Sequence, residues 1–211
     1  MVNKNIIDIV LTELDYAIST IYNNNNISDF KVSAKTTNKK LDTNKAKQSE
    51  RVMRINHMGE VCAQGLYRGQ AAFTSDDKVR GKLYEICEEE NYHLKLCNQR
   101  LEELDGKKSI LNPLWYLSSF VLGSIAGIND KKWKLGFIEE TEKQVEDHLT
   151  ASIKQLPKED LRSKEILQII AKDEKRHRNT AKKIGSEDLP TKAKKSMHLL
   201  SAIMKKITYY V

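Results

Sequence analysis

Apolar side chains recur at every third or fourth position along four long stretches of this chain, a pattern typical of amphipathic helices. Gly106 and Gly185 follow the second and the fourth stretch, Pro157 separates the third from the fourth, and residues 75–77 precede the second as candidate caps. The pattern predicts an all-α protein whose four helices pack as a bundle. The expected helices span residues 47–73, 77–104, 131–155 and 159–184.

The region before these helices has a different pattern. Residues 5–22 carry apolar side chains on one helical face and predict a short amphipathic helix. Residues 23–26 are a polar interruption, and residues 27–46 are rich in Asn, Thr, Lys and Ser, which favours a flexible linker. We therefore expect an N-terminal unit over residues 1–46, followed by a bundle over residues 47–190.

Composition narrows the class of protein. Hydrophobic residues make up 39% of the 211 residues and charged residues 31%, which is typical of a globular domain. The net charge of +7 is compatible with an anionic membrane, nucleic acid or an acidic partner, but no nucleic-acid-binding motif accompanies the basic residues. The N-terminus lacks the pattern of a signal peptide, and Asp8, Glu13 and Asp15 argue against a mitochondrial transit peptide.

Two apolar segments do not fit a plain bundle. Residues 111–128 are almost uncharged and are short for a membrane span, so an interfacial or re-entrant segment fits them better than a transmembrane helix. A buried core helix is the other alternative, and Gly123 and Gly127 would let a neighbouring helix approach closely. Residues 191–211 combine an apolar face, lysines and two tyrosines. That combination is typical of a helix on a membrane surface, and equally of a helix packed on the bundle.

Candidate chemistry lies on the second and fourth predicted helices. The segment EEENYH places Glu90 and His93 three residues apart, and DEKRH does the same for Glu174 and His177. Residues at i and i+3 share one helix face. Each pair interrupts an otherwise apolar seam, where charged groups are costly unless they are paired or bind metal. The seam positions are 83, 86, 97, 101 and 104 on the second helix, and 167, 170 and 181 on the fourth.

The other two helices each supply one inward carboxylate. Glu60 is the only acidic residue in the central part of the first helix. On the third helix Glu142 is the polar member of an apolar stripe, whereas Glu139, Glu140 and Glu146 are expected at the rim or in solvent. The choice of Glu142 rests on helical periodicity, whereas that of Glu60 rests on the absence of another acidic residue, because the apolar seam around Glu60 is less regular.

Two Glu-x-x-His pairs and two single glutamates form the ligand set of a di-iron carboxylate site in a helix bundle. Carboxylates bridge the two metal ions and balance their charge, and each imidazole occupies one position. Manganese accepts the same ligands, and a buried polar network without metal is the structural alternative. Spacings of 30 residues from Glu60 to Glu90 and 32 from Glu142 to Glu174 indicate two duplicated hairpins. The predicted ligands are Glu60, Glu90, His93, Glu142, Glu174 and His177.

The remaining histidines leave alternatives open. His57 shares a face with Glu60, and His148 lies roughly opposite Glu142 on an ideal helix. Each has either a role beside the metal or the substrate, or a surface or capping role. His198 is expected at an interface with the membrane.

The three cysteines fit no disulfide framework or zinc motif. Cys97 follows His93 by four residues, so a ligand role is conceivable. Cys62, Cys87 and Cys97 are better interpreted as small buried helix residues in a reducing compartment.

The chain from Arg51 to Val211 resembles the demethoxyubiquinol hydroxylases of ubiquinone biosynthesis, and its N-terminal helix and linker resemble their bacterial branch. The resemblance is carried by RINHMGEVCAQGLYRGQ, EEENYHLKLCNQRLEEL, LNPLWYLSSFVLGSIAGI, LGFIEETEKQVEDHL and KDEKRHRNTA. It implies a ferritin-like bundle that holds two iron ions through the same six residues, with Glu90 and Glu174 bridging.

The resemblance also implies an activity and partners. The family hydroxylates the ring of a polyprenyl demethoxyubiquinol with O2, and the second oxygen atom leaves as water. No Gly-rich dinucleotide motif is present, so an external donor, or a reductant bound without that motif, must supply the electrons. Residues 111–128 would grip the bilayer and admit the polyprenyl tail. We expect a peripheral protein on the cytoplasmic side of a bacterial inner membrane, which contacts membrane lipids and other ubiquinone-biosynthesis proteins but no nucleic acid.

Three rival functions share parts of this pattern. An iron-storage protein would use a similar site but would need neither the uncharged segment nor the basic, aromatic C-terminal segment. A peroxidase or catalase of the same fold is distinguished by its metal. A lipid-binding module that carries a prenyl quinone would keep its function after loss of Glu90 or Glu174.

Overall fold

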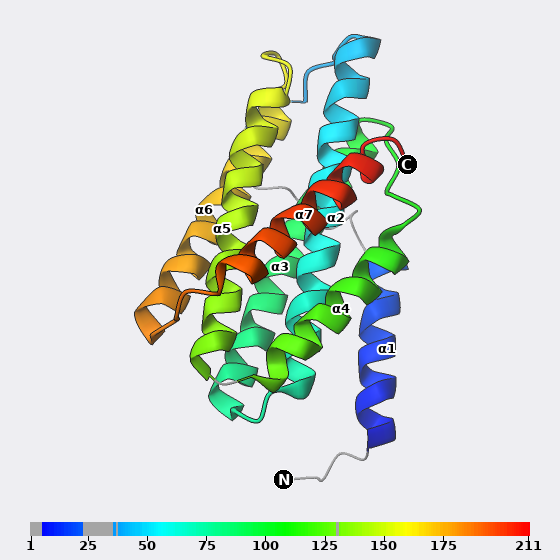
Figure 1. The fold of residues 1–211 in the computed structure, drawn as a ribbon. Helices are drawn as coiled ribbons and strands as arrows, with labels where there is room; N and C mark the ends of the chain where they lie inside the picture. Colours follow the sequence, from blue (N-terminus) through cyan, green and yellow to red (C-terminus); the bar gives the residue numbers. More distant parts are fainter. Residues whose placement is uncertain (1–5, 23–35, 37, 130) are drawn as a thin grey trace.

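The structure is a computed structural model that describes residues 6–22, 36, 38–129 and 131–211. The described residues form α-helices joined by short connections, with no β-strand among them (Figure 1). The predicted all-α fold is therefore confirmed, whereas residues 23–26 and half of the predicted linker lie outside the described residues. The helices are α1 Ile6–Tyr22, α2 Thr43–Phe73, α3 Asp77–Glu103, α4 Asn112–Ile128, α5 Lys131–Gln155, α6 Leu161–Ile184 and α7 Thr191–Thr208.

Local capping interactions set several helix boundaries. Asp76 begins α3 as predicted, because its side chain accepts hydrogen bonds from the next amides of the first turn. The Asp160 carboxylate accepts a bond of 3.0 Å from the Ser163 amide at the start of α6. At the other end of α6, Gly185 adopts the left-handed conformation with a φ of 105°, which confirms it as the predicted stop.

Three predicted helix ends were wrong. α6 begins at Leu161 and not at residue 159. α2 begins at Thr43, because Asp42 caps it, so residues 43–46 are helical and do not belong to the linker. α3 ends at Glu103, and the residue that takes a left-handed φ after it is Asp105, at 53°. Gly106 has a different role, since a Cβ there would lie 2.5 Å from the Cγ atom of Glu50 on α2.

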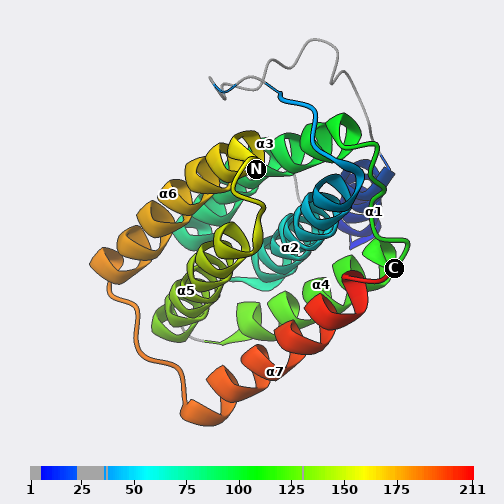
Figure 2. The same ribbon diagram turned by 90° about the horizontal axis from the view of Figure 1, so that it is seen from above.

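Two helix hairpins form the bundle. α2 pairs with α3, α5 pairs with α6, and the two hairpins face each other across a common core (Figure 2). α4 packs along the outer side of α2, and α7 and α1 flank it. One side of the molecule is therefore formed by α3 and α6, and the opposite side by α4, α7 and α1.

The core contains the apolar seams that the sequence predicted. Leu83 and Leu101 of α3, Leu149 of α5, and Leu167 and Ile170 of α6 are all buried. Each buried aliphatic side chain of this size contributes about 1.5–3 kcal/mol relative to an exposed one. The hydrophobic seams thus provide the rigid scaffold on which the charged residues between them are held.

Glycines allow α2 and α4 to approach until their backbones touch. A side-chain carbon at Gly123 or Gly127 of α4 would collide with the α2 backbone, and one at Gly65 or Gly69 of α2 would collide with the α4 backbone. Each pair is spaced by four residues, so both glycines of a helix lie on the contact face. The close approach predicted for Gly123 and Gly127 is confirmed, and its counterpart is on α2.

Polar contacts attach α1 to the bundle. Arg68 of α2 donates two hydrogen bonds, of 2.7 and 2.8 Å, to the Glu13 carboxylate. Tyr16 donates a bond of 2.6 Å to Gln64, and its ring lies 4.1 Å from the Arg68 guanidinium. Bidentate guanidinium–carboxylate pairs fix orientation as well as position. The anchored face leaves other apolar residues of α1, such as Leu14, exposed.

The outer side formed by α1, α4 and α7 is unusually apolar. α4 buries Trp115 against the bundle and exposes Leu117, Val121 and Ile125. α4 is therefore a surface helix with one buried face, so the alternative of a core helix for residues 111–128 is wrong. Among the described residues, no helix combines the length and apolarity needed to cross a membrane.

Candidate metal centre

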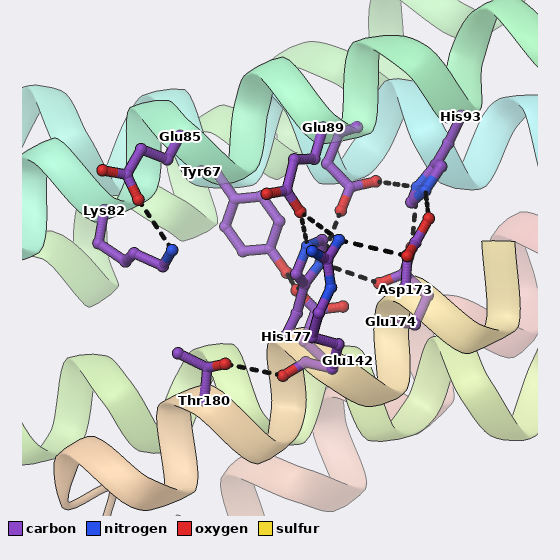
Figure 3. A network of polar contacts seen from close by, with 12 residues as sticks. Tyr67, Lys82, Glu85, Glu89, His93, Glu142, Asp173, Glu174, His177 and Thr180 are labelled. Carbon is purple, nitrogen blue, oxygen red and sulfur yellow. Dashed lines mark hydrogen bonds and ion pairs between the residues drawn. The ribbon is translucent and has the colours of Figure 1, made fainter.

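The structure brings all six predicted ligands together in the core between the two hairpins. Figure 3 shows four of them, His93, Glu142, Glu174 and His177. Every one of these side chains is at most 5% exposed. Their convergence follows from helical periodicity, because each occupies the central position of an inward-facing seam. The residues are Glu60 from α2, Glu90 and His93 from α3, Glu142 from α5, and Glu174 and His177 from α6.

Two of the glutamates face both histidines. The Nδ1 atom of His93 lies 3.3 Å from Glu90 Oε2 and 3.2 Å from Glu174 Oε1. The Nδ1 atom of His177 lies 3.5 Å from Glu90 Oε1 and 3.7 Å from Glu174 Oε2. Each of these carboxylates thus presents one oxygen to each histidine, which is the arrangement that bridges two adjacent cations.

The other two glutamates each approach one histidine. Glu60 Oε2 lies 3.9 Å from His93 Nδ1, and Glu142 Oε1 lies 3.9 Å from His177 Nδ1. Two four-residue groups result, in each of which one ligand atom per residue lies within 4.8 Å of the others. The groups are Glu60, Glu90, His93 and Glu174, and Glu90, Glu142, Glu174 and His177.

The donor set fits a pair of divalent cations. Glu90 Oε1, Glu174 Oε1 and His177 Nδ1 are buried and lack a hydrogen-bond partner among the described residues. Buried polar atoms are rarely left unpaired, so these three are available as ligands. Four ionised carboxylates with two neutral imidazoles carry four negative charges, which two divalent ions neutralise. A polar network without metal explains neither the orphaned atoms nor the excess of carboxylates.

Electrostatics show what the centre does without cations. Burial, followed by repulsion from Glu90, raises the pKa of Glu60 well above its usual value, and burial and Glu174 do the same to the pKa of Glu142. Burial would lower the pKa of His177, but the facing carboxylates of Glu174 and Glu90 raise it to about 10. Protons therefore occupy the centre in place of cations, and metal binding must release them.

A second layer of charged residues orients the histidines. His93 Nε2 of α3 lies 3.3 Å from Asp173 of α6, and His177 Nε2 of α6 contacts Glu89 of α3. Each histidine therefore meets a carboxylate from the opposite hairpin. Arg176 joins the two carboxylates, at 2.9 Å from Glu89 and 3.2 Å from Asp173. Such contacts fix the imidazole tautomer and direct the other ring nitrogen toward a metal. Sequence reasoning missed this layer, although an acidic residue directly precedes the bridging glutamate in both motifs.

Tyr67 is a further residue that sequence reasoning did not assign to the site. Its side chain comes from α2, is fully buried, and donates a hydrogen bond to Glu142 (Figure 3). Burial and the neighbouring Glu142 raise the pKa of Tyr67 well above its usual value, so the phenol keeps its proton. Tyr67 therefore holds in place one carboxylate oxygen of Glu142, which approaches only one of the two histidines.

A cavity of about 150 Å³ begins beside Glu60 and lies between α2, α4, α5 and α7. Most of its lining is apolar. Gly59 widens it, because a Cβ at this position would meet no neighbouring group within 4 Å. Leu122 of α4 and Leu200 of α7 line the cavity and are 39% and 43% exposed, so it reaches the surface between these two helices.

His148 lines this cavity, whereas His57 does not. Ser152 Oγ lies 3.4 Å from His148 Nε2 and 3.2 Å from Asn56 Nδ2, which forms a polar group in an apolar wall. Burial, assisted by Lys205, lowers the pKa of His148 to about 4, so the imidazole is neutral. His148 is thus a neutral polar residue in the cavity wall.

The other histidines differ in exposure. His57 is 1% exposed, so a surface role is wrong, and its Nδ1 atom lies 3.5 Å from the side-chain nitrogen of Asn112 on α4. His198 is exposed on α7, 3.6 Å from Glu140. The expectation that Glu140 lies at the rim or in solvent was wrong, because α7 covers it and Lys194 lies 3.7 Å away. Glu146 does lie at the rim, paired with an arginine at 2.7 Å.

The cysteines are free thiols. Cys87 and Cys97 are buried and Cys62 is half-buried, as expected for small helix residues. Cys97 belongs to neither four-residue group, so the structure gives no support to a ligand role for it.

Fold and site together define a class of protein. Helix bundles in which two hairpins each contribute one glutamate and one Glu-x-x-His pair form the ferritin-like group of binuclear metal proteins. A family model described as ubiquinone biosynthesis protein COQ7 matches residues 47–209, and the chain belongs to this family. That result confirms the resemblance drawn from the sequence motifs.

Curated relatives carry the name 3-demethoxyubiquinol 3-hydroxylase. The protein of Xanthomonas oryzae pv. oryzae strain PXO99A is 42% identical over 203 residues, which cover 96% of this chain and 94% of the relative. That of Xanthomonas campestris pv. campestris strain 8004 is 41% identical over the same shares. The protein of Azoarcus sp. strain BH72 is 43% identical over 171 residues, 81% of this chain and 83% of the relative.

Proposed function

We propose that this chain hydroxylates the ring of a polyprenyl 3-demethoxyubiquinol, using O2, in ubiquinone biosynthesis. One observation carries the proposal: a buried centre of four carboxylates and two histidines adjoins, through Glu60, an apolar cavity that reaches the surface. The names of the curated relatives supply the substrate class. The iron-storage rival accounts for the carboxylates but not for the cavity beside Glu60.

The residues that would hold the metal are the six that converge in the core, with Glu90 and Glu174 shared. We propose two ferrous ions, because four carboxylates and two imidazoles match their charge and ligand preference. When bound, the ions supply the redox chemistry that activates O2. The chain supplies the fixed geometry, since Tyr67 holds Glu142 and the Glu89–Asp173 layer holds the histidines.

The cavity gives the quinol a position and an orientation. Its ring would lie at the inner end near Glu60, with the polyprenyl tail leaving between Leu122 and Leu200. Apolar walls exclude water from the reacting carbon. Neutral His148, held near Ser152, is placed to accept a hydrogen bond from a quinol hydroxyl, which would set the face of the ring presented to the metal.

A quinone profile tests the function. Lipid extracts of cells that lack this gene should contain demethoxyubiquinone in place of ubiquinone, by mass spectrometry. Wild-type protein should restore ubiquinone, whereas Glu142→Ala should not, because it removes a buried ligand. Glu146→Ala, one helical turn along the same helix, is the matched control and should restore ubiquinone, because Glu146 pairs with Arg178 at the rim.

The alternative outcomes are distinct. An unchanged ubiquinone pool in cells without this or a redundant hydroxylase would refute the function. Restoration by Glu142→Ala would favour the rival lipid-binding module, which needs no metal. Metal content separates the peroxidase and catalase rival, because the purified protein should contain two iron ions per chain and no manganese.

We also propose a peripheral position on the cytoplasmic side of a bacterial inner membrane. Leu117, Val121 and Ile125 form an exposed apolar stripe on α4, next to the cavity mouth, and α7 adds exposed Leu199 and Ile203. Exposed patches of this kind mark sites of membrane or protein interaction. α7 also exposes Lys192, Lys195 and Lys206, which suit an anionic lipid surface.

Vesicle binding tests the position. The protein should sediment with vesicles that contain phosphatidylglycerol, and Leu117→Ser/Ile125→Ser should remove at least nine-tenths of this binding, since about 0.8 kcal/mol is lost per CH₂ no longer buried. Leu161→Ser is the control, because Leu161 is 49% exposed at the start of α6, away from α4 and α7. Equal sedimentation of all three proteins would overturn the proposal.

A further inference from the structure

The side formed by α3 and α6 has a small surface hollow with a candidate metal ligand at its base. The hollow has a volume of about 90 Å³ and is lined by His177, Glu89, Arg176 and Thr180, together with apolar residues of α3, α5 and α6. Figure 3 shows Glu89, His177 and Thr180 around this region. The substrate cavity opens elsewhere, between α4 and α7.

Polar contacts connect both histidines to solvent on this side. His177 Nε2 contacts Glu89, and His93 Nε2 lies 3.3 Å from Asp173. The side chains of Glu89 and Asp173 are 38% and 30% exposed, and that of Arg176, which joins them, is 58% exposed. The buried centre is therefore one residue away from water here, whereas the substrate cavity separates it from the surface on the α4 side.

The exposed face of α6 next to the hollow is basic, and we call it the basic rim. Between residues 172 and 183, the exposed residues are one asparagine and five lysines or arginines, of which Arg176 lines the hollow, whereas the one aspartate, Asp173, is partly buried. α3 is more mixed, since Glu85 pairs with Lys82 at 2.8 Å and Glu88 is exposed. A stripe of one charge on a helix attracts a partner of the opposite charge. The basic residues are Lys172, Lys175, Arg176, Lys182 and Lys183.

We propose that this basic rim binds a small acidic protein that carries a one-electron cofactor, and that the carrier reduces the metal centre through the edge of His177. The inference rests on the proposed function. Hydroxylation forms a C–O bond, breaks a C–H bond and leaves one oxygen atom as water, so it consumes O2, two electrons and two protons. Two successive carriers give up one electron each, and solvent supplies the protons.

The shape of the surface suits a transient partner. Electron-transfer complexes bury little area, often below about 1,200 Å², and depend on charge complementarity for their rate of association. A shallow hollow bordered by flexible lysines meets this need, whereas a stable interface would require a larger apolar patch. The apolar patches of this molecule lie on α1, α4 and α7. Reductant and quinol would therefore approach from opposite sides and would not compete.

Reconstitution with a defined donor tests the proposal. The iron-loaded protein is given a short-chain 3-demethoxyubiquinol, O2, and an acidic plant-type [2Fe–2S] ferredoxin with its reductase. We expect Lys172→Glu/Lys183→Glu to lower the ferredoxin-driven rate and the ferredoxin affinity at least tenfold at low salt. The wild-type rate should fall as salt increases, because screening weakens the attraction. Lys154→Glu/Lys158→Glu is the control of equal charge, since Lys154 is exposed in the last turn of α5 and Lys158 is exposed just after it, and it should match wild type.

A chemical reductant separates this proposal from the proposed function. Dithionite with methyl viologen, a small cation, should drive a single turnover at the same rate in all three proteins. If it drives none in wild type, the proposed function fails. If all three respond equally to ferredoxin, or if NADH alone sustains the full rate without a carrier, the donor proposal is overturned while the hydroxylase function stands.

Discussion

The side of the bundle formed by α3 and α6 and the side covered by α4 and α7 contribute differently to the metal centre. α3 and α6 supply both histidines, both shared glutamates and the charged layer behind them, and they expose basic residues. α2 and α5 supply one glutamate each, and beyond α2 lies the apolar layer of α4 and α7 with the cavity between. The polar side therefore supplies more of the candidate ligands than the side with the apolar cavity.

This contrast explains how one buried centre can be both rigid and accessible. Histidines locked by outer carboxylates need an aqueous side where those carboxylates remain charged. A quinol with an apolar tail needs a side without charges. Placing both on one face would expose the tail to lysines or bury the outer carboxylates. The duplicated hairpins separate the two requirements, and added helices cover only one side.

The largest effect is expected where the apolar layer meets the bundle. Gly123→Ala should lower the free energy of unfolding by about 3 kcal/mol or more, because the new methyl group would collide with the α2 backbone, which cannot move as a side chain can. Urea unfolding followed by circular dichroism measures it. The control is Gly81→Ala in α3, which meets nothing within 4 Å and should stabilise the protein by about 0.5–1 kcal/mol. Equal stability of the two variants would show that α4 does not pack closely.

The next effect concerns the polar side. Asp173→Asn and Glu89→Gln should each weaken metal binding about 10- to 100-fold, because each leaves one histidine without a charged partner at Nε2. Competition with a chelator measures the affinity. Glu85→Gln, one turn before Glu89 and paired only with Lys82 at the surface, should leave it unchanged. A loss in one of the two variants alone would mean that the two half-sites are not equivalent.

The sequence alone predicted the features that depend on helical periodicity, namely which side chains of a helix face the core. Seams on three helices identified Glu90, His93, Glu142, Glu174 and His177 as inward, and the structure buries all of them. Glu60 was found by the absence of any rival acid on its stretch of helix. Each inference needed only the geometry of a single helix and the high cost of burying a charge.

What depends on contacts between distant segments was not predictable. Glu140 was placed at the rim because its own helix gives no sign that α7 covers it. Nothing in the sequence of its helix distinguishes Tyr67 from an ordinary aromatic residue, and only the packing of α2 against α5 reveals its hydrogen bond to Glu142. The cavity and the surface hollow likewise arise from several helices at once, so no local pattern encodes them.

The smallest expected effect is on the pH dependence of stability, and it tests the packing of the apolar side. His57 is buried next to Asn112 of α4, and burial, with a smaller effect of Lys108, lowers its pKa from 6.5 to about 3. Below pH 6.5 His57 binds a proton in the unfolded chain, whereas in the folded chain it stays neutral until the pH approaches 3. The contribution of neutral His57 to the free energy of unfolding is therefore fully present above pH 6.5. It is lost as the pH falls toward 3, at about 1.4 kcal/mol per pH unit.

His57→Gln should remove this slope, because glutamine does not titrate. The free energy of unfolding of metal-free wild type should therefore decrease more steeply than that of the variant between pH 6 and pH 4.5, by about 1.4 kcal/mol per unit. The metal ligands titrate too, but they do so equally in both proteins, so only the difference between the slopes counts. His198→Gln, at an exposed position on α7, is the control. Parallel curves for wild type and His57→Gln would mean that water or an anion reaches His57, and that α4 seals this side less tightly than its glycine contacts imply.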